Sequence, residues 1–287
     1  DAFQKTADMG STNYEQVGFY FKYKIPNPET GKIKIVYVPQ YSLMAEHCFE
    51  QRNMCFDDSL SLQYHDNHWG LLSKNELNNF IWEQNKEGIK PAHIDSFAKA
   101  IRSKCHDGAF KFQSTEQKIN LGNGILDIVS GLLSDHSSAY QFRYIIPVEF
   151  NRDAQCPRWL EFLDFVFKGN KELATVAQKI FGYTLLGGDP FLHKAFVLYG
   201  TGRNGKSTFL DVLKALLGEE SYSTVSLSKL HKEFSVVIMD GKLANICEET
   251  PNDEINAEVF KAIVGGGEVQ AARKGFDEFT LRVNARF

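Results

Sequence analysis

Residues 197–218 read VLYGTGRNGKSTFLDVLKALLG, which is a short apolar run, a glycine-rich turn and a helical repeat of leucines. Gly200, Gly205, Lys206 and Ser207 satisfy the pattern G-x-x-x-x-G-K-[ST]. In that pattern, backbone N–H groups of the turn and of a helix N-terminus surround phosphate oxygens. An ordinary strand-to-helix turn would account for the glycines, but it gives no reason for a lysine followed by a hydroxyl. The stretch therefore predicts a nucleotide site.

The sequence on both sides of the turn suits such a site. KAFVLYG, residues 194–200, is predicted to be a buried parallel strand, and residues 207–218 an amphipathic helix. Lys206 is expected to bridge the β- and γ-phosphates, and Ser207 to hold Mg²⁺. The residues predicted to surround the nucleotide are Gly200, Gly202, Asn204, Gly205, Lys206, Ser207 and Thr208. The predicted cofactors are ATP and Mg²⁺.

A second segment supplies carboxylates. GKLANICEET, residues 241–250, is predicted to be a strand ending in Glu248 and Glu249. A phosphoryl-transfer site needs an acid for the magnesium shell, and a hydrolase also needs a group that orients water. Adjacent residues of a strand point to opposite sides, so the two glutamates are expected to divide these roles. Glu248 is assigned to Mg²⁺ and Glu249 to water; the alternatives are the reverse assignment and two solvated glutamates.

The last segment carries a cationic turn. EVQAARKG and FDEFTLRV, residues 268–283, are predicted to be two strands joined at Lys274 and Gly275. Arg273 and Lys274 are candidate contacts to the phosphate backbone of single-stranded DNA. The alternative is an ordinary hairpin whose lysine is solvated.

The composition is that of an ordinary globular protein. Among 287 residues, 43% are hydrophobic and 24% are charged, and the length allows two domains. A formal net charge of −4 argues against passive wrapping by nucleic acid, but it is compatible with a narrow basic channel. Five scattered cysteines without a CxxC pair indicate reduced thiols in the cytoplasm. No apolar run reaches the ~18–20 residues that span a bilayer, so no membrane partner is expected.

The N-terminal part has a different pattern. Residues 18–25 and 32–39 alternate in hydrophobicity around PNPETG and predict a β-hairpin. Ser73 and Glu76 form a capping box that predicts the start of a helix. Aromatic residues interleaved with lysines in the hairpin suit stacking on bases, although one face of a core is the alternative. Further along, Pro157 is placed to begin a helix.

The order of these motifs resembles the C-terminal helicase region of phage, plasmid and poxvirus-type primases, in helicase superfamily three. The segments that carry the resemblance are INLGNGILDI (119–128), DAQCPRWLEFLDFVF (153–167), IFGYTLLGG (180–188), FVLYGTGRNGKSTFLDVLKALLG (196–218), GKLANICEE (241–249) and FKAIVGGGEVQAARKGFDEF (260–279). The resemblance covers residues 119–287, whereas residues 1–118 resemble the family only loosely.

The resemblance implies three regions: a mixed α+β N-terminal domain over 1–118, a connecting segment and helical collar over 119–190, and an AAA-like α/β P-loop ATPase core over 191–287, incomplete at its C-terminus. It implies a helicase that hydrolyses ATP and moves on single-stranded DNA at a replication fork. A homo-oligomeric ring, expected to be a hexamer, and a fused or associated primase or polymerase domain belong to the same expectation. A phage or plasmid origin would place the protein in the host cytoplasm.

Residue roles carry over by motif. Lys206, with Gly205, Ser207 and Thr208, matches the first nucleotide motif (Walker A), and Glu248 with Glu249 matches the second. Lys261, Gly266, Arg273 and Lys274 fall in the segment that, in this family, couples nucleotide state to a DNA-contacting hairpin.

Two departures from the family pattern affect the expectations. Gly267 stands where the family has an acidic residue, with Glu268 following it. The family's sensor asparagine and its arginine finger are expected beyond Phe287, and such an arginine is worth ~10³–10⁵ in rate. We therefore expect ATP binding with slow hydrolysis. The competing hypotheses are a non-hydrolysing oligomerisation and loading platform for a fused primase-polymerase, and a small-molecule P-loop kinase, which the carboxylates and the hairpin disfavour.

Overall fold

The computed structural model describes residues 14–51, 53–56, 60–85, 87, 89–107, 117–248, 254–274 and 278–287. The helices are α1 (Tyr41–Gln51), α2 (Lys74–Gln84), α3 (Pro91–Lys104), α4 (Pro157–Val166), α5 (Lys171–Leu185), α6 (Lys206–Leu217), α7 (Glu233–Val236) and α8 (Ala257–Val264). The short 3₁₀ turns are η1 (Glu219–Ser221), η2 (Leu227–Lys229) and η3 (Val237–Met239).

The strands are short. They are β1 (Tyr14–Val17), β2 (Tyr20–Pro26), β3 (Ile33–Pro39), β4 (Met54–Phe56), β5 (Ser61–His65), β6 (His68–Leu71), β7 (Lys118–Leu121), β8 (Gly124–Asp127), β9 (Leu133–Ser134), β10 (Tyr222–Ser223), β11 (Ala244–Asn245), β12 (Glu268–Ala271) and β13 (Phe279–Arg282). The chain divides into two compact units, one of Asp1–Gln63 with Leu71–Phe110 and one of Tyr64–Gly70 with Lys111–Phe287. Each is described by itself below.

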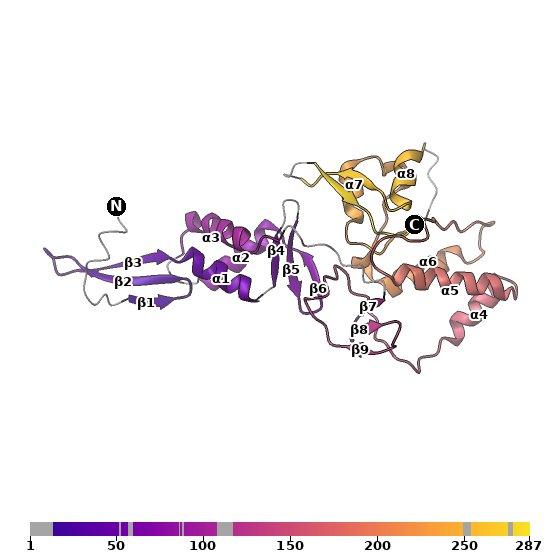
Figure 1. Cartoon of the computed structure of the whole chain (residues 1–287), viewed down its shortest axis with the longest axis horizontal. Helices are drawn as coiled ribbons and strands as arrows, with labels where there is room; N and C mark the ends of the chain where they lie inside the picture. Colours follow the sequence, from indigo (N-terminus) through magenta and orange to yellow (C-terminus); the bar gives the residue numbers. More distant parts are fainter. Residues whose placement is uncertain are drawn as a thin grey trace. The chain divides into compact units, whose positions relative to one another are not determined.

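The first unit begins with the antiparallel sheet β1–β2–β3 (Figure 1). β2 and β3 pair along their whole length, which confirms the predicted hairpin. Asn27 fixes the turn between them, because its side-chain oxygen accepts hydrogen bonds from the N–H groups of Glu29 (2.8 Å) and Thr30 (3.0 Å). An asparagine that closes its own turn in this way sets the register of the hairpin.

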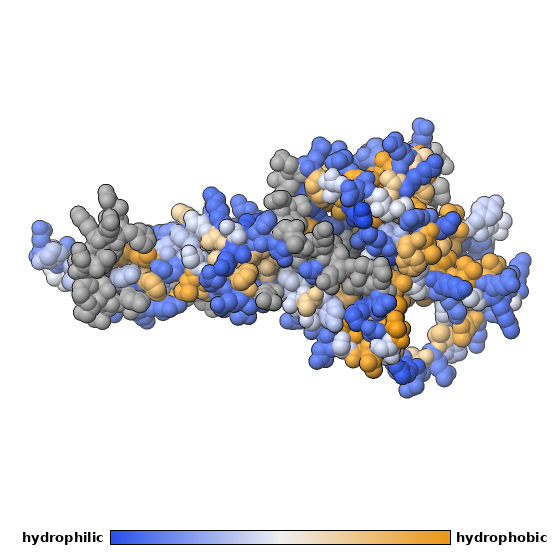
Figure 2. Space-filling model, viewed as in Figure 1, coloured by the Kyte–Doolittle hydropathy of each residue, from blue (hydrophilic) through white to orange (hydrophobic). Residues whose placement is uncertain are grey.

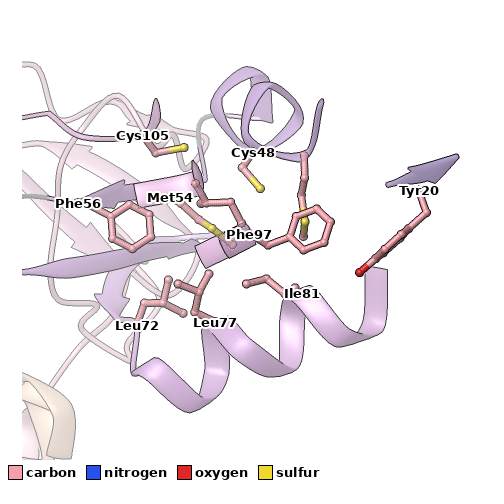
Figure 3. Packing of buried hydrophobic residues seen from close by; sticks show 11 residues of the cluster. Tyr20, Cys48, Met54, Phe56, Leu72, Leu77, Ile81, Phe97 and Cys105 are labelled. Carbon is pink, nitrogen blue, oxygen red and sulfur yellow. The ribbon is translucent and has the colours of Figure 1, made fainter. Parts of the chain in front are cut away.

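Helices α1, α2 and α3 supply most of the core of the first unit. Figure 3 shows Leu77 and Ile81 projecting from one face of α2 into this core, where they and Phe97 of α3 are completely buried. The capping box is confirmed: the Ser73 hydroxyl accepts from the N–H of Glu76, and the Glu76 carboxylate accepts from the N–H of Ser73. The helix start is therefore set locally, and its apolar face fixes its packing.

In the second unit, α4 and α5 pack on α6. α4 begins at Pro157 as predicted, since a proline at the first helical position lacks only an N–H that would have no helical partner. Trp159 of α4 stacks on Phe162 with ring centroids 5.3 Å apart. Both join an apolar cluster with Phe181 of α5 and Phe209 of α6. Residues 119–190 and 191–287, which the sequence analysis separated, thus lie in one unit.

Two parallel pairings and one backbone hydrogen bond connect four segments of the second unit. β10 pairs with β11, and Ala244 of β11 forms a parallel bridge with Arg286. On the other side of this C-terminal segment, the N–H of Phe196 donates to the carbonyl of Phe287 (2.7 Å). Short as these pairings are, they give the spatial order β10, β11, residues 286–287 and residue 196.

The predicted buried strand over 194–200 is wrong. Among the described residues, the bond from Phe196 to Phe287 is the single backbone–backbone hydrogen bond of this segment. Val197 is 80% exposed and Tyr199 is 98% exposed. A strand needs a ladder of hydrogen bonds along at least one edge, and one bond does not make a ladder. Of the strand predicted over 241–250, the described residues 241–248 form only the two residues of β11.

The predicted C-terminal hairpin is confirmed. β12 and β13 pair antiparallel from Glu268 opposite Arg282 to Ala271 opposite Phe279. The hairpin follows α8, whose side-chain cap is Asn256. Gly275, predicted at the tip, lies outside the described residues.

Hydrophobic surface gathers over β8 and β9 on the face drawn in Figure 2. The exposed hydrophobic side chains there are Ile128, Val129, Leu132 and Leu133. A second exposed set lies on α4 and α5 and consists of Leu160, Phe165, Leu173 and Val176. Contiguous apolar surface of this kind is typical of contact surfaces.

Candidate nucleotide-binding site

Residues 200–205 lead into α6, which begins at Lys206. Gly205 takes the N-cap position with a φ of 84°, a left-handed conformation that favours glycine. Arg203 also has a positive φ, of 60°. No side chain among the described residues caps the first turn of α6, so its N–H groups remain available to an anion.

The loop rests on α4. A β-carbon at position 205 would lie 2.7 Å from Val166 Cγ1 and 3.1 Å from Phe162 Cε2, and both residues belong to α4. Gly202 differs, because a β-carbon there would meet no described atom within 4 Å. One end of the turn is therefore packed and the other is open.

Lys206 is folded back onto its own loop. Its ammonium donates to the carbonyl of Gly200 (3.0 Å) and to the side-chain oxygen of Asn204 (2.9 Å), with a longer contact to the carbonyl of Thr201 (3.4 Å). These are uncharged acceptors. A phosphate oxygen is a stronger acceptor for an ammonium than these carbonyl and amide oxygens, because it carries a negative charge.

A cavity of about 220 Å³ lies beside the loop. Lys206, Ser207 and Glu248 all line it, and most of the remaining wall is apolar, from α5, α6 and the segments 195–198 and 244–247. The structure thus gathers three of the predicted site residues around one cavity. Asn204 contacts this group through Lys206, and Thr208 is exposed on the first turn of α6.

The residues at the cavity fit a magnesium ion by the chemistry of their donors. Ser207 and Glu248 offer oxygen, which Mg²⁺ prefers, and both line the same space. Within the described part of the chain, no group of three or more His, Cys, Asp and Glu side chains could hold a metal by itself. A site with few protein ligands suits Mg²⁺, which keeps several waters and takes further oxygens from phosphates.

Glu248 is held by a residue that the sequence analysis did not single out. Lys214 of α6 forms an ion pair with Glu248, and the two side chains are 17% and 57% exposed, respectively. The hydrogen bond to Glu248 raises the pKa of Lys214. Lys214 follows Lys206 by eight positions, in the same stripe of the helix, and this spacing is the signal that could have found it. Glu249 lies outside the described residues, so its role stays a prediction.

Arg273 lies in the connection between β12 and β13, two residues after the end of β12. Its guanidinium pairs with Asp240, which also accepts from Arg143 (2.7 Å). It also lies over the ring of Phe279, 4.7 Å from the centroid. These contacts give Arg273 a structural role. Lys274, the next residue, is exposed; DNA contact by the two residues stays a prediction, for which Lys274 has the more accessible side chain.

Two buried polar residues border the cavity and were also missed. Asn245 is 3% exposed and bonds the backbone of Val225 in both directions, at 2.7 and 2.9 Å. Arg286 is 3% exposed, donates to the carbonyl of Gly188 (2.7 Å) and lies over the ring of Tyr183. Burial lowers the pKa of Arg286. A single polar residue within an apolar run does not show in the sequence which distant residues it will contact in the fold.

Two family descriptions match parts of the chain. "D5 N terminal like" matches residues 51–168, and "Family of unknown function (DUF5906)" matches residues 198–287, which contain the phosphate loop and the hairpin. The first match begins well before residue 119, so a family pattern extends further toward the N-terminus than the motifs indicated. No curated protein matches the chain significantly.

A solved structure shares the fold. It is described as "The A form apo structure of NrS-1 C terminal region-CTR", with a TM-score of 0.52 and 17% sequence identity over 85% of this chain. The chain spans 55% of the length of that structure. At 17% identity this likeness shows a shared fold, and each of the two family descriptions covers less than half of the chain. No helix in the described ranges has the length and apolar character to cross a membrane.

Proposed function

We propose that this chain is the ATP-dependent helicase module of a phage-type replication primase-helicase, with an AAA-like P-loop ATPase core. In this proposal it binds ATP with Mg²⁺, hydrolyses it, moves on single-stranded DNA and unwinds the duplex at a replication fork. One observation carries the proposal: Lys206, Ser207 and Glu248 line one cavity beside a helix N-terminus that no described side chain caps. The parallel pairings around β11 support it further.

The chemistry assigned to each residue follows from its position. The N–H groups of the first turn of α6 bind phosphate oxygens, and Lys206 exchanges the carbonyl of Gly200 for those oxygens. Ser207 and Glu248 would hold the magnesium ion, which supplies neutralisation of the phosphate charge when bound. Glu249 orients the attacking water. The apolar wall of the cavity excludes other water, which strengthens the electrostatic contacts inside.

DNA contact is assigned to the β12–β13 hairpin. Lys274 and Arg282 are exposed cations of the hairpin, but Arg282 pairs with Asp189 and Glu268. An ammonium such as that of Lys274 next to a phosphate backbone adds a salt-dependent contact. Arg273 holds the connection between the two strands in place through its ion pair with Asp240. The ring-shaped assembly remains part of the proposal, supported by the exposed hydrophobic side chains of α4 and α5.

The test is nucleotide binding and turnover, with and without single-stranded DNA, for the chain and for Lys206→Ala. Two charged contacts from Lys206 to phosphate are worth about 3 kcal/mol, so we expect Lys206→Ala to weaken nucleotide binding about 100-fold. The matched control is Lys179→Ala, which removes an exposed lysine of α5 and should leave binding unchanged. Equal binding by the chain and Lys206→Ala would contradict the proposal.

Turnover separates the proposal from its main alternative, a platform that assembles without hydrolysis. The exposed hydrophobic set on α4 and α5 favours assembly in either case. DNA-stimulated hydrolysis that disappears in Lys206→Ala supports the helicase. Ring assembly in sedimentation experiments, without hydrolysis by the chain or by a form extended past Phe287, would favour the platform.

A further inference from the structure

The ion pair between Lys214 and Glu248 lies at the edge of the cavity that the proposed function assigns to Mg²⁺ and nucleotide. Glu248 lines the cavity, while Lys214 approaches it from the third turn of α6. Lys214 is the more buried partner, with a side chain 17% exposed. Its surroundings therefore leave the ammonium few conformations other than the one that contacts Glu248. The pair therefore fixes the Glu248 carboxylate in the nucleotide-free protein.

A divalent cation and an ammonium compete for the same carboxylate. Like charges repel over several ångströms, and the repulsion is stronger near a protein surface than in bulk water. A magnesium ion that uses Glu248, directly or through water, would meet the charge of Lys214 beside it. The ion pair must loosen before the carboxylate turns toward the metal, and this loosening opposes metal binding.

We infer that Lys214 is a positioning residue that restrains Glu248 and thereby sets the Mg²⁺ concentration that the nucleotide site requires. The inference rests on the proposed function, because it takes Glu248 as the magnesium ligand. It adds a regulatory property of that site: the affinity for metal is lower than Ser207 and Glu248 alone would give. Lys214 acts through Glu248 and does not itself contact the nucleotide.

The test is a magnesium titration of nucleotide binding that does not depend on turnover. A fluorescent, non-hydrolysable ATP analogue is bound to the full chain at fixed concentration, and binding is followed from chelator to millimolar Mg²⁺. Partly exposed ion pairs correspond to a factor of about two to five in an equilibrium constant. We expect Lys214→Met to lower the half-saturating Mg²⁺ concentration by about that factor, and Lys214→Gln to do the same.

Two controls make the result specific. Lys179→Met removes a charge from the exposed face of α5 and should leave the magnesium titration unchanged. In a Glu248→Gln background the effect of Lys214→Met should vanish, because the carboxylate through which Lys214 acts is gone. An unchanged or higher magnesium requirement in Lys214→Met overturns the inference, as does an effect that persists in Glu248→Gln.

Failure of the proposed function would have a different signature. Binding of the analogue at saturating Mg²⁺ depends on Lys206 and on the N–H groups of α6, whatever the role of Lys214. If that binding is absent or is unaffected by Lys206→Ala, the nucleotide site itself is disproved, and the inference with it. If it is present and sensitive to Lys206, only the magnesium titration decides the role of Lys214. Thermal melting of each variant identifies any that does not fold.

Discussion

Two carboxylates eight positions apart, Asp240 and Glu248, have opposite environments. Asp240 is 7% exposed and is shared by two arginines, of which Arg143 is 5% exposed. Glu248 is 57% exposed and is held by one lysine. Both acids stabilise contacts between distant segments, but only the second can exchange its partner without unfolding the surroundings. The comparison indicates that a charged side chain that stabilises the fold is buried and shared between partners. The charged side chain of the candidate site lies at the surface, where a ligand can replace its partner.

Removing the buried carboxylate tests this contrast most strongly. Asp240→Asn removes the acid that Arg143 and Arg273 share, whose side chains are 5% and 16% exposed, and breaking a buried pair costs about 3–5 kcal/mol. We expect the free energy of unfolding, measured by urea denaturation, to fall by that amount. Glu248→Gln is the matched control and should cost less than about 1 kcal/mol, because its pair is largely exposed. If both variants lowered the free energy of unfolding equally, the distinction between the buried and the exposed carboxylate would be wrong.

Arg273 and Lys274, which are adjacent in the hairpin, allow the same comparison between a paired and an exposed charge, with smaller expected changes in stability. Arg273→Met loses a charged hydrogen bond to Asp240, which is worth about 1.5–3 kcal/mol. Lys274→Met changes an exposed position and should stay within about 0.5 kcal/mol of the unchanged chain. Urea denaturation of both variants gives the comparison. The structural role assigned to Arg273 would be wrong if Lys274→Met lowered the free energy of unfolding more than Arg273→Met did.

Salt provides the smallest and most specific test. A double-mutant cycle of Lys214→Met and Glu248→Gln should give a coupling of about 0.2–1 kcal/mol at low ionic strength. In about 1 M salt the screening length falls to about 3 Å, so this coupling should disappear. The cost of Asp240→Asn should change little, because buried pairs are screened much less. A salt-resistant coupling at Glu248 would mean that its pair belongs with the buried ones.

The features that sequence alone predicted are those decided by near neighbours. Ser73 with Glu76, Pro157 and Asn27 each act on backbone groups within a few residues, so their patterns specify the helix starts and the turn. The glycine-rich turn before α6 is equally local, and Lys206 and Ser207 line one cavity with Glu248, while their roles toward a nucleotide stay predictions.

The features that sequence missed depend on partners far along the chain. The segment 194–200 has the composition of a strand, but pairing is a property of its neighbours, and the described structure gives it one backbone bond. Arg273 has the charge of a DNA contact, yet its partner Asp240 lies 33 positions away. Lys214 joins the site only because α6 packs beside the segment that carries Glu248. Patterns specify residue types, and folding decides which of them meet.

Two of the three glycines in the turn before α6, Gly202 and Gly205, differ in how freely they can change over evolutionary time. At Gly202 a side chain would meet no described neighbour within 4 Å. At Gly205 any other residue is opposed twice, by the positive φ and by Val166 of α4. Position 202 can therefore accept a side chain, whereas the size of residue 166 is constrained together with that of residue 205.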